Sequence, residues 1–264
     1  MMSTLTLSLL AIFFVFGLII GSFLNVVICR WNTKRSLGGR SMCMSCQNSL
    51  YWYDLIPFIS FFILRGRCRH CKTRISAIYP LVEVFTGLIF VALFLKFQDI
   101  FFISLSAFIV TYAYYAAMFS LLIVIAFYDL RHKIIPDTLS FIFGLLAFIG
   151  LFFFTSYGFY PHIPSIFEFF GALVALPLFL LWLVSGGRWM GLGDAKLALG
   201  LGWMLGISKA ISGVVLGFWI GAAAGILLIL FLKNHKIKSE IPFAPFLVLG
   251  AFLSFFFELH LLGI

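Results

Sequence analysis

Long runs of apolar residues, interrupted by short polar segments, set the pattern of this chain. A membrane-spanning helix needs about 20 mostly apolar residues, and eight stretches approach or exceed that length. They lie near residues 5–28, 79–96, 100–128, 138–154, 166–184, 194–206, 208–232 and 243–259. The third stretch is long enough to be tilted or broken, and the sixth is short and rich in glycine. The pattern predicts an all-α integral membrane protein with about eight transmembrane helices.

The composition favours the same interpretation. Of the 264 residues, 63% are hydrophobic and 10% charged, and the mean hydropathy is +1.16. A soluble domain is about half apolar and a quarter charged, so a soluble fold is excluded. The first stretch, Leu5 to Ile28, has no preceding basic residue and exceeds the apolar region of about 7–15 residues in a secretory signal. It is therefore expected to be retained as a helix.

Basic residues gather between alternate apolar stretches, and they predict the orientation in the membrane. Sixteen of the eighteen lysines and arginines fall on one side if all eight stretches cross: Arg30, Lys34, Arg35, Arg40, Arg65, Arg67, Arg69, Lys72, Arg74, Arg131, Lys133, Arg188, Lys196, Lys233, Lys236 and Lys238. Only Lys96 and Lys209 fall on the other side. Because basic segments favour the cytoplasm, the long loop after the first stretch is predicted to be cytoplasmic and both termini external. Topology and contact with anionic membrane lipids then explain the net charge of +9, without nucleic-acid binding.

Four of the five cysteines form two pairs in the cytoplasmic loop. Cys43 and Cys46, like Cys68 and Cys71, are separated by two residues, and 21 residues lie between the pairs. This spacing is close to that of tetrahedral zinc sites, and cytoplasmic thiols are kept reduced, which makes a disulfide framework the weaker interpretation. A structural zinc would stabilise a loop with little core of its own. Paired redox thiols and cysteines without a ligand are the alternatives.

Three acidic residues near the predicted helix ends need individual explanations. Asp137 follows Pro136 and precedes a long apolar run, which is typical of a helix N-cap. Glu83 lies inside the second stretch, where a carboxylate is costly enough to need a partner or a role. Asp129 ends the third stretch and has no capping role. A structural ion pair with Arg131 or Lys133 is its alternative to a functional one.

Asp194 is the other acid without a structural explanation. It lies in the sequence Gly191-Leu192-Gly193-Asp194-Ala195-Lys196, where the two glycines remove side-chain bulk beside the carboxylate and let another backbone come close. Asp129 and Asp194 are predicted at the same membrane face. Two adjacent carboxylates do not both ionise readily, so one can hold a proton while the other activates water, as in aspartic proteases.

These motifs, in this order, resemble the bacterial prepilin peptidases, also called type IV leader peptidases, which belong to the GxGD aspartic proteases. The stretches that carry the resemblance are Gly21–Ile28, the two cysteine pairs, Arg65–Arg69, Tyr79–Glu83, Asp129 with Ile135–Asp137, Gly191–Lys196 and Pro242–Phe246. The resemblance implies a multi-pass protein of the bacterial inner membrane with its active site facing the cytoplasm. It divides the chain into a first transmembrane helix (1–29), a cytoplasmic four-cysteine zinc-binding loop associated with methylation (30–78) and a polytopic aspartic peptidase domain (79–264).

The resemblance also implies an activity and its residues. Members cleave the basic leader of type IV pilin and pseudopilin precursors, with catalytic aspartates that match Asp129 and Asp194, supported by the motif residues Gly191, Gly193 and Lys196. Many then methylate the new N-terminus with S-adenosylmethionine. That second activity is associated with the cysteine loop and with positions that match Gly66 and Glu83.

Some residues depart from the family pattern and affect methylation rather than proteolysis. Cys29-Arg30-Trp31-Asn32 replaces the usual Tyr-Arg-Leu-Pro, Met44 stands where proline is common, and Ile78 replaces a basic residue. A peptidase without methylation is therefore the alternative. A proton-coupled transporter would place acids through the depth of the membrane, and a zinc-dependent adaptor would leave Asp129 and Asp194 unexplained.

Overall fold

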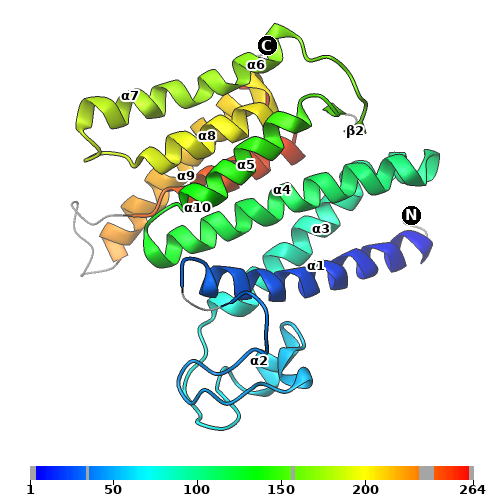
Figure 1. Ribbon diagram of the computed structural model, residues 1–264, viewed down its shortest axis with the longest axis vertical. Coiled ribbons are helices and arrows are strands. Elements are labelled where there is room, and N and C mark those ends of the chain that lie inside the picture. Colours follow the sequence, from blue (N-terminus) through cyan, green and yellow to red (C-terminus); the bar gives the residue numbers. More distant parts are fainter. Residues whose placement is uncertain (1–3, 34–35, 156–157, 232–240, 262–264) are drawn as a thin grey trace.

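The computed structural model describes residues 4–33, 36–155, 158–231 and 241–261. Each of the eight apolar stretches coincides with a helix or a continuous helical segment, so the predicted helical membrane fold is confirmed (Figure 1). The corresponding elements are α1 (Thr4–Arg30), α3 (Ile78–Ile103), α4 (Leu105–His132), α5 (Asp137–Gly150), the consecutive α6 (Ile166–Phe169), η2 (Phe170–Val174) and α7 (Ala175–Ser185), α8 (Leu192–Leu205), α9 (Ile207–Phe231) and α10 (Ala244–Phe256).

The helices differ in whether they can cross a membrane alone. Within the described ranges, five are long and apolar enough to do so: Leu5–Arg30, Ile78–Ile103, Leu105–His132, Ile166–Ser185 and Ile207–Phe231. By contrast α5, α8 and α10 have 14, 14 and 13 residues. Fourteen residues rise roughly 21 Å, less than the hydrocarbon core of about 30 Å. The number of eight full crossings therefore stays a prediction.

The break between the second and third helices lies later than the sequence predicted. The predicted gap fell at residues 97–99, but α3 continues through them to Ile103. The chain turns at Ser104, which is extended and whose hydroxyl accepts the Ala107 N–H (3.4 Å), as an N-cap of α4. Lys96 lies within α3 and donates to the Phe255 carbonyl (2.9 Å). This long-range contact thus stabilises the charged Lys96 within α3, at a position where the local sequence predicts the end of the helix.

The segment α6–η2–α7 lies closely against α8 at its irregular middle part, η2. Gly171 of η2 lies directly against Gly202 of α8, and a Cβ on either residue would overlap the carbonyl group of the other. Two backbones approach this closely only where side chains are absent, a common feature of helix packing in membranes. The contact fixes α8, the helix that carries Asp194, against its neighbour.

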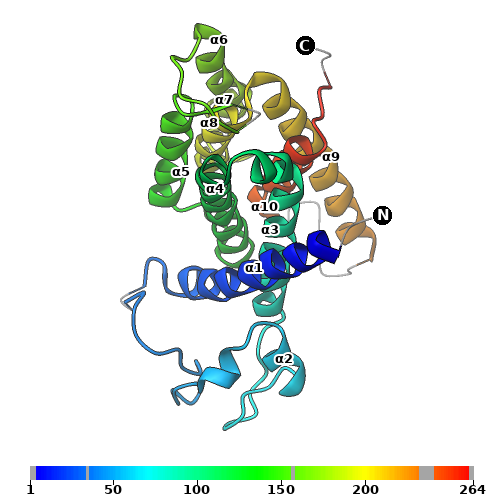
Figure 2. The ribbon, with the colours of Figure 1, turned by 90° about the vertical axis from the view of Figure 1, so that its right-hand side faces the viewer.

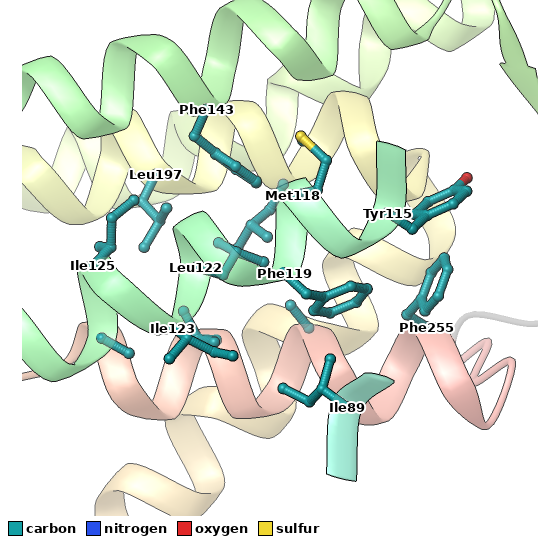
Figure 3. Packing of buried hydrophobic residues seen from close by; sticks show 14 of the residues in the cluster. Ile89, Tyr115, Met118, Phe119, Leu122, Ile123, Ile125, Phe143, Leu197 and Phe255 are labelled. Atoms are coloured by element: carbon teal, nitrogen blue, oxygen red, sulfur yellow. The ribbon is translucent and has the colours of Figure 1, made fainter. Parts of the chain in front are cut away.

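The core lies around α4, which contacts α1, α3, α5 and α10. In the most apolar 18-residue segment of α4, 61% of the residues are buried, whereas the corresponding segments of α1 and α9 have 17% and 6% of their residues buried. Helix α4 is therefore the central helix. Figure 3 shows Phe119 and Leu122 of α4 among buried side chains from its neighbours, including Phe143 of α5 and Leu197 of α8. The central position of α4 holds Asp129, in its last turn, in a fixed place.

Two parts of the chain lie outside the helical bundle. The described residues between α1 and α3, 31–33 and 36–77, form a separate lobe with two short elements, η1 (Trp52–Leu55) and α2 (Ile59–Ile63), below α1 in Figures 1 and 2. A small antiparallel hairpin of β1 (Phe154–Thr155) and β2 (Gly158–Phe159) follows α5, with Phe154 opposite Phe159. The hairpin was not predicted, because two-residue strands leave too short a pattern to detect.

Candidate active site

Asp129 is buried in the last turn of α4, with only 4% of its surface exposed. Its Oδ2 accepts the backbone N–H of Ala244, the first residue of α10, at 3.2 Å. The N-terminus of a helix carries unpaired N–H groups and a partial positive charge, which stabilise an anion. Local sequence around Asp129 does not reveal this partner, although Pro245 at the second position of α10 is typical of a helix start.

Asp194 is buried in the first turn of α8 and is 8% exposed. Gly191, the N-cap, is extended, and its carbonyl accepts the backbone N–H of Asp194 at 3.3 Å. The carboxyl groups of Asp194 and Asp129 lie close enough for the charge of one to act on the other. The fold therefore brings together the two acids that the sequence singled out, from α4 and α8, with each carboxylate at a helix N-terminus.

The residues around the pair correct two expectations. Asp137 does not cap α5: Pro136 is the N-cap, and Asp137 is the first helical residue. Its exposed carboxylate pairs instead with Lys196 of α8 at 2.7 Å, a long-range contact that local sequence did not show. Within the described residues neither Arg131 nor Lys133 forms an ion pair with Asp129. Arg131, two residues away, points to a different side of the helix, and Lys133 is the left-handed C-cap of α4. Arg131 donates to the Cys29 sulfur at 3.1 Å.

The four cysteines of the lobe converge. The Sγ atoms of Cys43, Cys46, Cys68 and Cys71 all lie within 4.8 Å of one another. Cys43 and Cys71 have their sulfurs 3.7 Å apart, close to the roughly 3.8 Å edge of a tetrahedron with Zn–S bonds of about 2.3 Å. The donor set and its spacing fit a tetrahedral thiolate metal, so the cluster can bind one.

The two cysteine pairs have the same backbone structure. In each, the N–H of the first cysteine donates to a carbonyl five residues later, from Cys43 to Asn48 and from Cys68 to Thr73. In each, the residue after the second cysteine, Gln47 or Lys72, has positive φ and donates back to the first cysteine. We call these two turns the knuckles. Such turns point both thiols of a pair to one side, as a shared metal requires.

The lobe has little else to hold it together. Of the described residues in the range 31–77, only Asp54 and Cys68 are buried. Asp54 pairs with Arg69 at 2.7 Å, which joins η1 to the second knuckle. The hydroxyl and backbone N–H of Thr73 lower the pKa of Cys71 to about 6, which favours the thiolate that metals bind. Burial and the neighbouring thiols instead raise the pKa of Cys46 to about 11.

Comparisons with known proteins assign the chain to a family. Residues 15–97 match the Bacterial Peptidase A24 N-terminal domain, and residues 116–232 match the Type IV leader peptidase family. A prepilin leader peptidase/N-methyltransferase of Aeromonas hydrophila is 35% identical over 91% of this chain and 88% of its own length. The chain belongs to the type IV leader peptidase family. The predicted resemblance is therefore confirmed, and the protein is a bacterial multi-pass membrane protein.

Other leader peptidases are similar over most of their length. The protein named prepilin leader peptidase/N-methyltransferase in Bacillus subtilis (strain 168) is 32% identical over 94% of both chains. The one in Myxococcus xanthus (strain DK1622) is 37% identical over 88% of this chain and 67% of its own. No solved structure matches the chain at a significant level. Asp129 and Asp194 both lie in the segment that matches the leader peptidase family.

Gly66 and Glu83, the residues that the resemblance associates with methylation, both contact the segment 58–61 of the lobe in this leader peptidase. Gly66, with φ of +64°, ends the turn after α2, and its N–H donates to the Phe61 carbonyl (2.8 Å). Glu83 of α3 is buried, and its Oε2 accepts the Phe58 N–H at 2.7 Å. Glu83 thus has the partner its position required. It joins the lobe to the bundle.

The glycines beside Asp194 have different structural roles, which gives a first prediction. A Cβ at Gly193 would lie 2.8 Å from the Ile135 Cβ, whereas one at Gly191 would meet the Asp194 Oδ2 at an ordinary 3.5 Å. Gly193→Ala would gain roughly 1 kcal/mol of helix propensity but overpack by about 1–3 kcal/mol. We expect it to lower the thermal unfolding temperature and leader cleavage, with Gly191→Ala as the mild control. Equal damage from both would show that space beside the carboxylate matters more than packing on Ile135.

Proposed function

We propose that Asp129 and Asp194 are the catalytic pair with which this leader peptidase cleaves prepilin and pseudopilin precursors. The observation that carries the proposal is the meeting of two buried carboxylates from α4 and α8. Burial of a charge in a membrane protein is costly and marks functional positions. Gly193 supports the pair by leaving room for α8 to pack on Ile135, and Lys196 follows Asp194 on α8 and pairs with the exposed Asp137.

The arrangement suits hydrolysis of a peptide bond. One carboxylate is ionised and takes a proton from water, whose oxygen then attacks the scissile carbonyl carbon. The other carboxyl group gives its proton to the carbonyl oxygen. Collapse of the tetrahedral intermediate breaks the C–N bond. The new N-terminal amine takes the proton that the first carboxylate received from water, and the second carboxylate regains its proton from a hydroxyl of the intermediate. The helix N-termini at α8 and α10 supply fixed dipoles that stabilise the ionised partner.

The orientation of this site toward the cytoplasm is part of the proposal, and basic residues support it. Arg131, Lys133, Arg188 and Lys196 lie close in sequence to the two aspartates, at the same helix ends. The lobe, also strongly basic, lies between the last residue of α1 and the first of α3. Lys34, Arg35, Lys233, Lys236 and Lys238, which contributed to the predicted topology, lie outside the described residues.

We also propose zinc as the metal of the four cysteines. N-methylation is proposed as a second activity, and the names of the relatives support it.

A cavity of about 550 Å³ beside Gly66 is lined by Ile63, Leu64, Arg65, Arg67, Cys68 and Lys72. Its positively charged side chains fit the carboxylate of S-adenosylmethionine. None of its lining residues is acidic, however, so none can pair with the positively charged sulfonium group of that molecule. The cavity fits only part of that methyl donor, and we assign no methyl-transfer step to it.

One experiment tests both activities. Purified protein in detergent is incubated with a prepilin precursor, with and without S-adenosylmethionine, and the products are analysed by mass spectrometry. We expect loss of the leader in both reactions and the mass of one added methyl group only with the methyl donor. Cleavage without methylation would show a peptidase only, and no cleavage by the folded protein would contradict the proposed function.

A further inference from the structure

A second cavity lies at the end of the bundle opposite to the aspartates. Its volume is about 650 Å³, within the range of ligand sites. It is lined by residues from the late part of α3, the early part of α4, the end of α8, the start of α9 and the hairpin. Asp129 and Asp194 lie at the other ends of α4 and α8. The cavity is thus separate from the proposed active site and has no part in its chemistry.

Two lysines and a histidine give this cavity an excess of positive charge. The side chains of Lys96 and Lys209 are only 13% and 10% exposed, and both pair with the single carboxylate of Glu258, one on each oxygen. Glu168 and His162 also line the cavity and pair at 3.1 Å, and the Tyr160 carbonyl together with Glu168 raises the pKa of His162. With His162 protonated, three cationic groups face the two carboxylates of Glu258 and Glu168 and leave one positive charge. An anion at this place would balance it.

The wall of the cavity offers a hydrogen-bond donor and apolar surface. Trp203 lines the cavity, and its buried indole N–H has no hydrogen-bond partner in the described part of the chain. A buried donor without a partner is unfavourable, so an acceptor supplied by a ligand would satisfy it. Tyr115, Phe154, Phe159 and Phe255 line the same space with aromatic rings. The occupant must therefore combine an anionic, oxygen-rich head with an apolar body.

We propose that this cavity binds the phosphodiester head group of an anionic phospholipid from the membrane leaflet opposite to the aspartates. The lysines match the negative phosphate, the Trp203 N–H matches its oxygens, and the aromatic wall matches the first part of the acyl chains. A lipid is favoured over free phosphate because most of the wall is apolar and the surrounding helices lie in the bilayer. The lipid would brace the ends of α3, α9 and α10, which the Glu258 pairs already join.

Native mass spectrometry tests this proposal on the full-length protein. The protein is delipidated in an uncharged detergent and titrated with phosphatidylglycerol or, in parallel, with zwitterionic phosphatidylcholine. We expect preferential binding of phosphatidylglycerol, which Lys209→Gln weakens by about tenfold or more, as expected for a lost charged hydrogen bond. Arg40→Gln, which removes an exposed charge in the lobe, is the matched control and should bind as the wild type does.

Two further variants separate binding from folding. Trp203→Phe keeps an aromatic ring and removes the N–H, and it should weaken binding several-fold at an unchanged unfolding temperature. Glu258→Gln frees both lysines and should strengthen binding of phosphatidylglycerol. If these residues had only a structural role, all three variants would change binding in the same direction. Equal binding of the two lipids, or wild-type binding by both Lys209→Gln and Trp203→Phe, would overturn the proposal. Complete displacement of phosphatidylglycerol by millimolar inorganic phosphate would show that the cavity binds free phosphate rather than a lipid head group, and this too would overturn the proposal.

Discussion

Asp129→Asn and Asp194→Asn are each expected to lower leader cleavage by at least about 10³-fold, because an amide cannot exchange the proton that the pair must transfer. The change keeps the size of the side chain, so the packing around the central helix α4 should persist. Removal of a costly buried charge should leave the unfolding temperature equal or higher. The measurement is the rate of precursor cleavage in detergent, together with the thermal unfolding temperature of each variant.

Asp137→Asn is the matched control for this prediction. Asp137 is also an aspartate at a helix end near the site, but its carboxylate is exposed and pairs only with Lys196. An exposed ion pair contributes about 0–1 kcal/mol, so cleavage should change by no more than a few-fold. An inactive Asp137→Asn protein beside an active Asp129→Asn protein would show that the catalytic pair is wrongly assigned.

Cys68→Ser is expected to remove bound zinc and to weaken methylation more than cleavage. Cys68 is the buried member of the cluster, and the lobe has almost no other buried side chain. Structural zinc contributes on the order of 10 kcal/mol to folding in small zinc domains. Its loss should therefore disorder the lobe, whereas Asp129 and Asp194 belong to α4 and α8 in the bundle. Elemental analysis and the two-product assay measure these effects at matched protein concentration.

Cys29→Ser provides the control, since Cys29 is the one cysteine outside the cluster. Its sulfur contacts Arg131 and Tyr79, and the variant should keep one zinc per chain. Zinc that persists in Cys68→Ser, or disappears in Cys29→Ser, would contradict the assigned ligands. Equal loss of cleavage and methylation in a folded Cys68→Ser protein would instead indicate that the lobe binds substrate for both reactions.

Much of the fold and site was accessible from the sequence because it depends on local signals. Apolar stretches predicted every long helix, since a chain in a bilayer must pair its backbone groups within helices. The cysteine spacing predicted the four-cysteine cluster, because each knuckle needs only a few consecutive residues. The two aspartates emerged by elimination, since a membrane protein has few acids and most have an ordinary explanation.

The remaining features depend on contacts between distant segments. Ser104 ends α3 later than the Lys96–Asp99 region suggested, because Lys96 finds a partner on α10. Asp137 looked like a cap by local pattern, but Lys196, 59 residues away, holds its carboxylate. The Ala244 N–H reaches Asp129 across 115 residues. No single sequence segment carries such pairings.

The knuckles also set the length of the free linker between α1 and α3. Without metal, 47 residues (31–77) connect the two helices, whereas a metal that joins the cysteines leaves only 18 of them, 31–42 and 72–77, as free linker. Shortening the linker in this way raises the effective concentration of one helix at the other. The change in loop-closure entropy is only roughly 0.8 kcal/mol, because it varies with the logarithm of length. The helical hairpin is thus held mainly by its own packing and by the hydrogen bond from Asn25 to the Tyr79 carbonyl, and metal depletion should leave it paired.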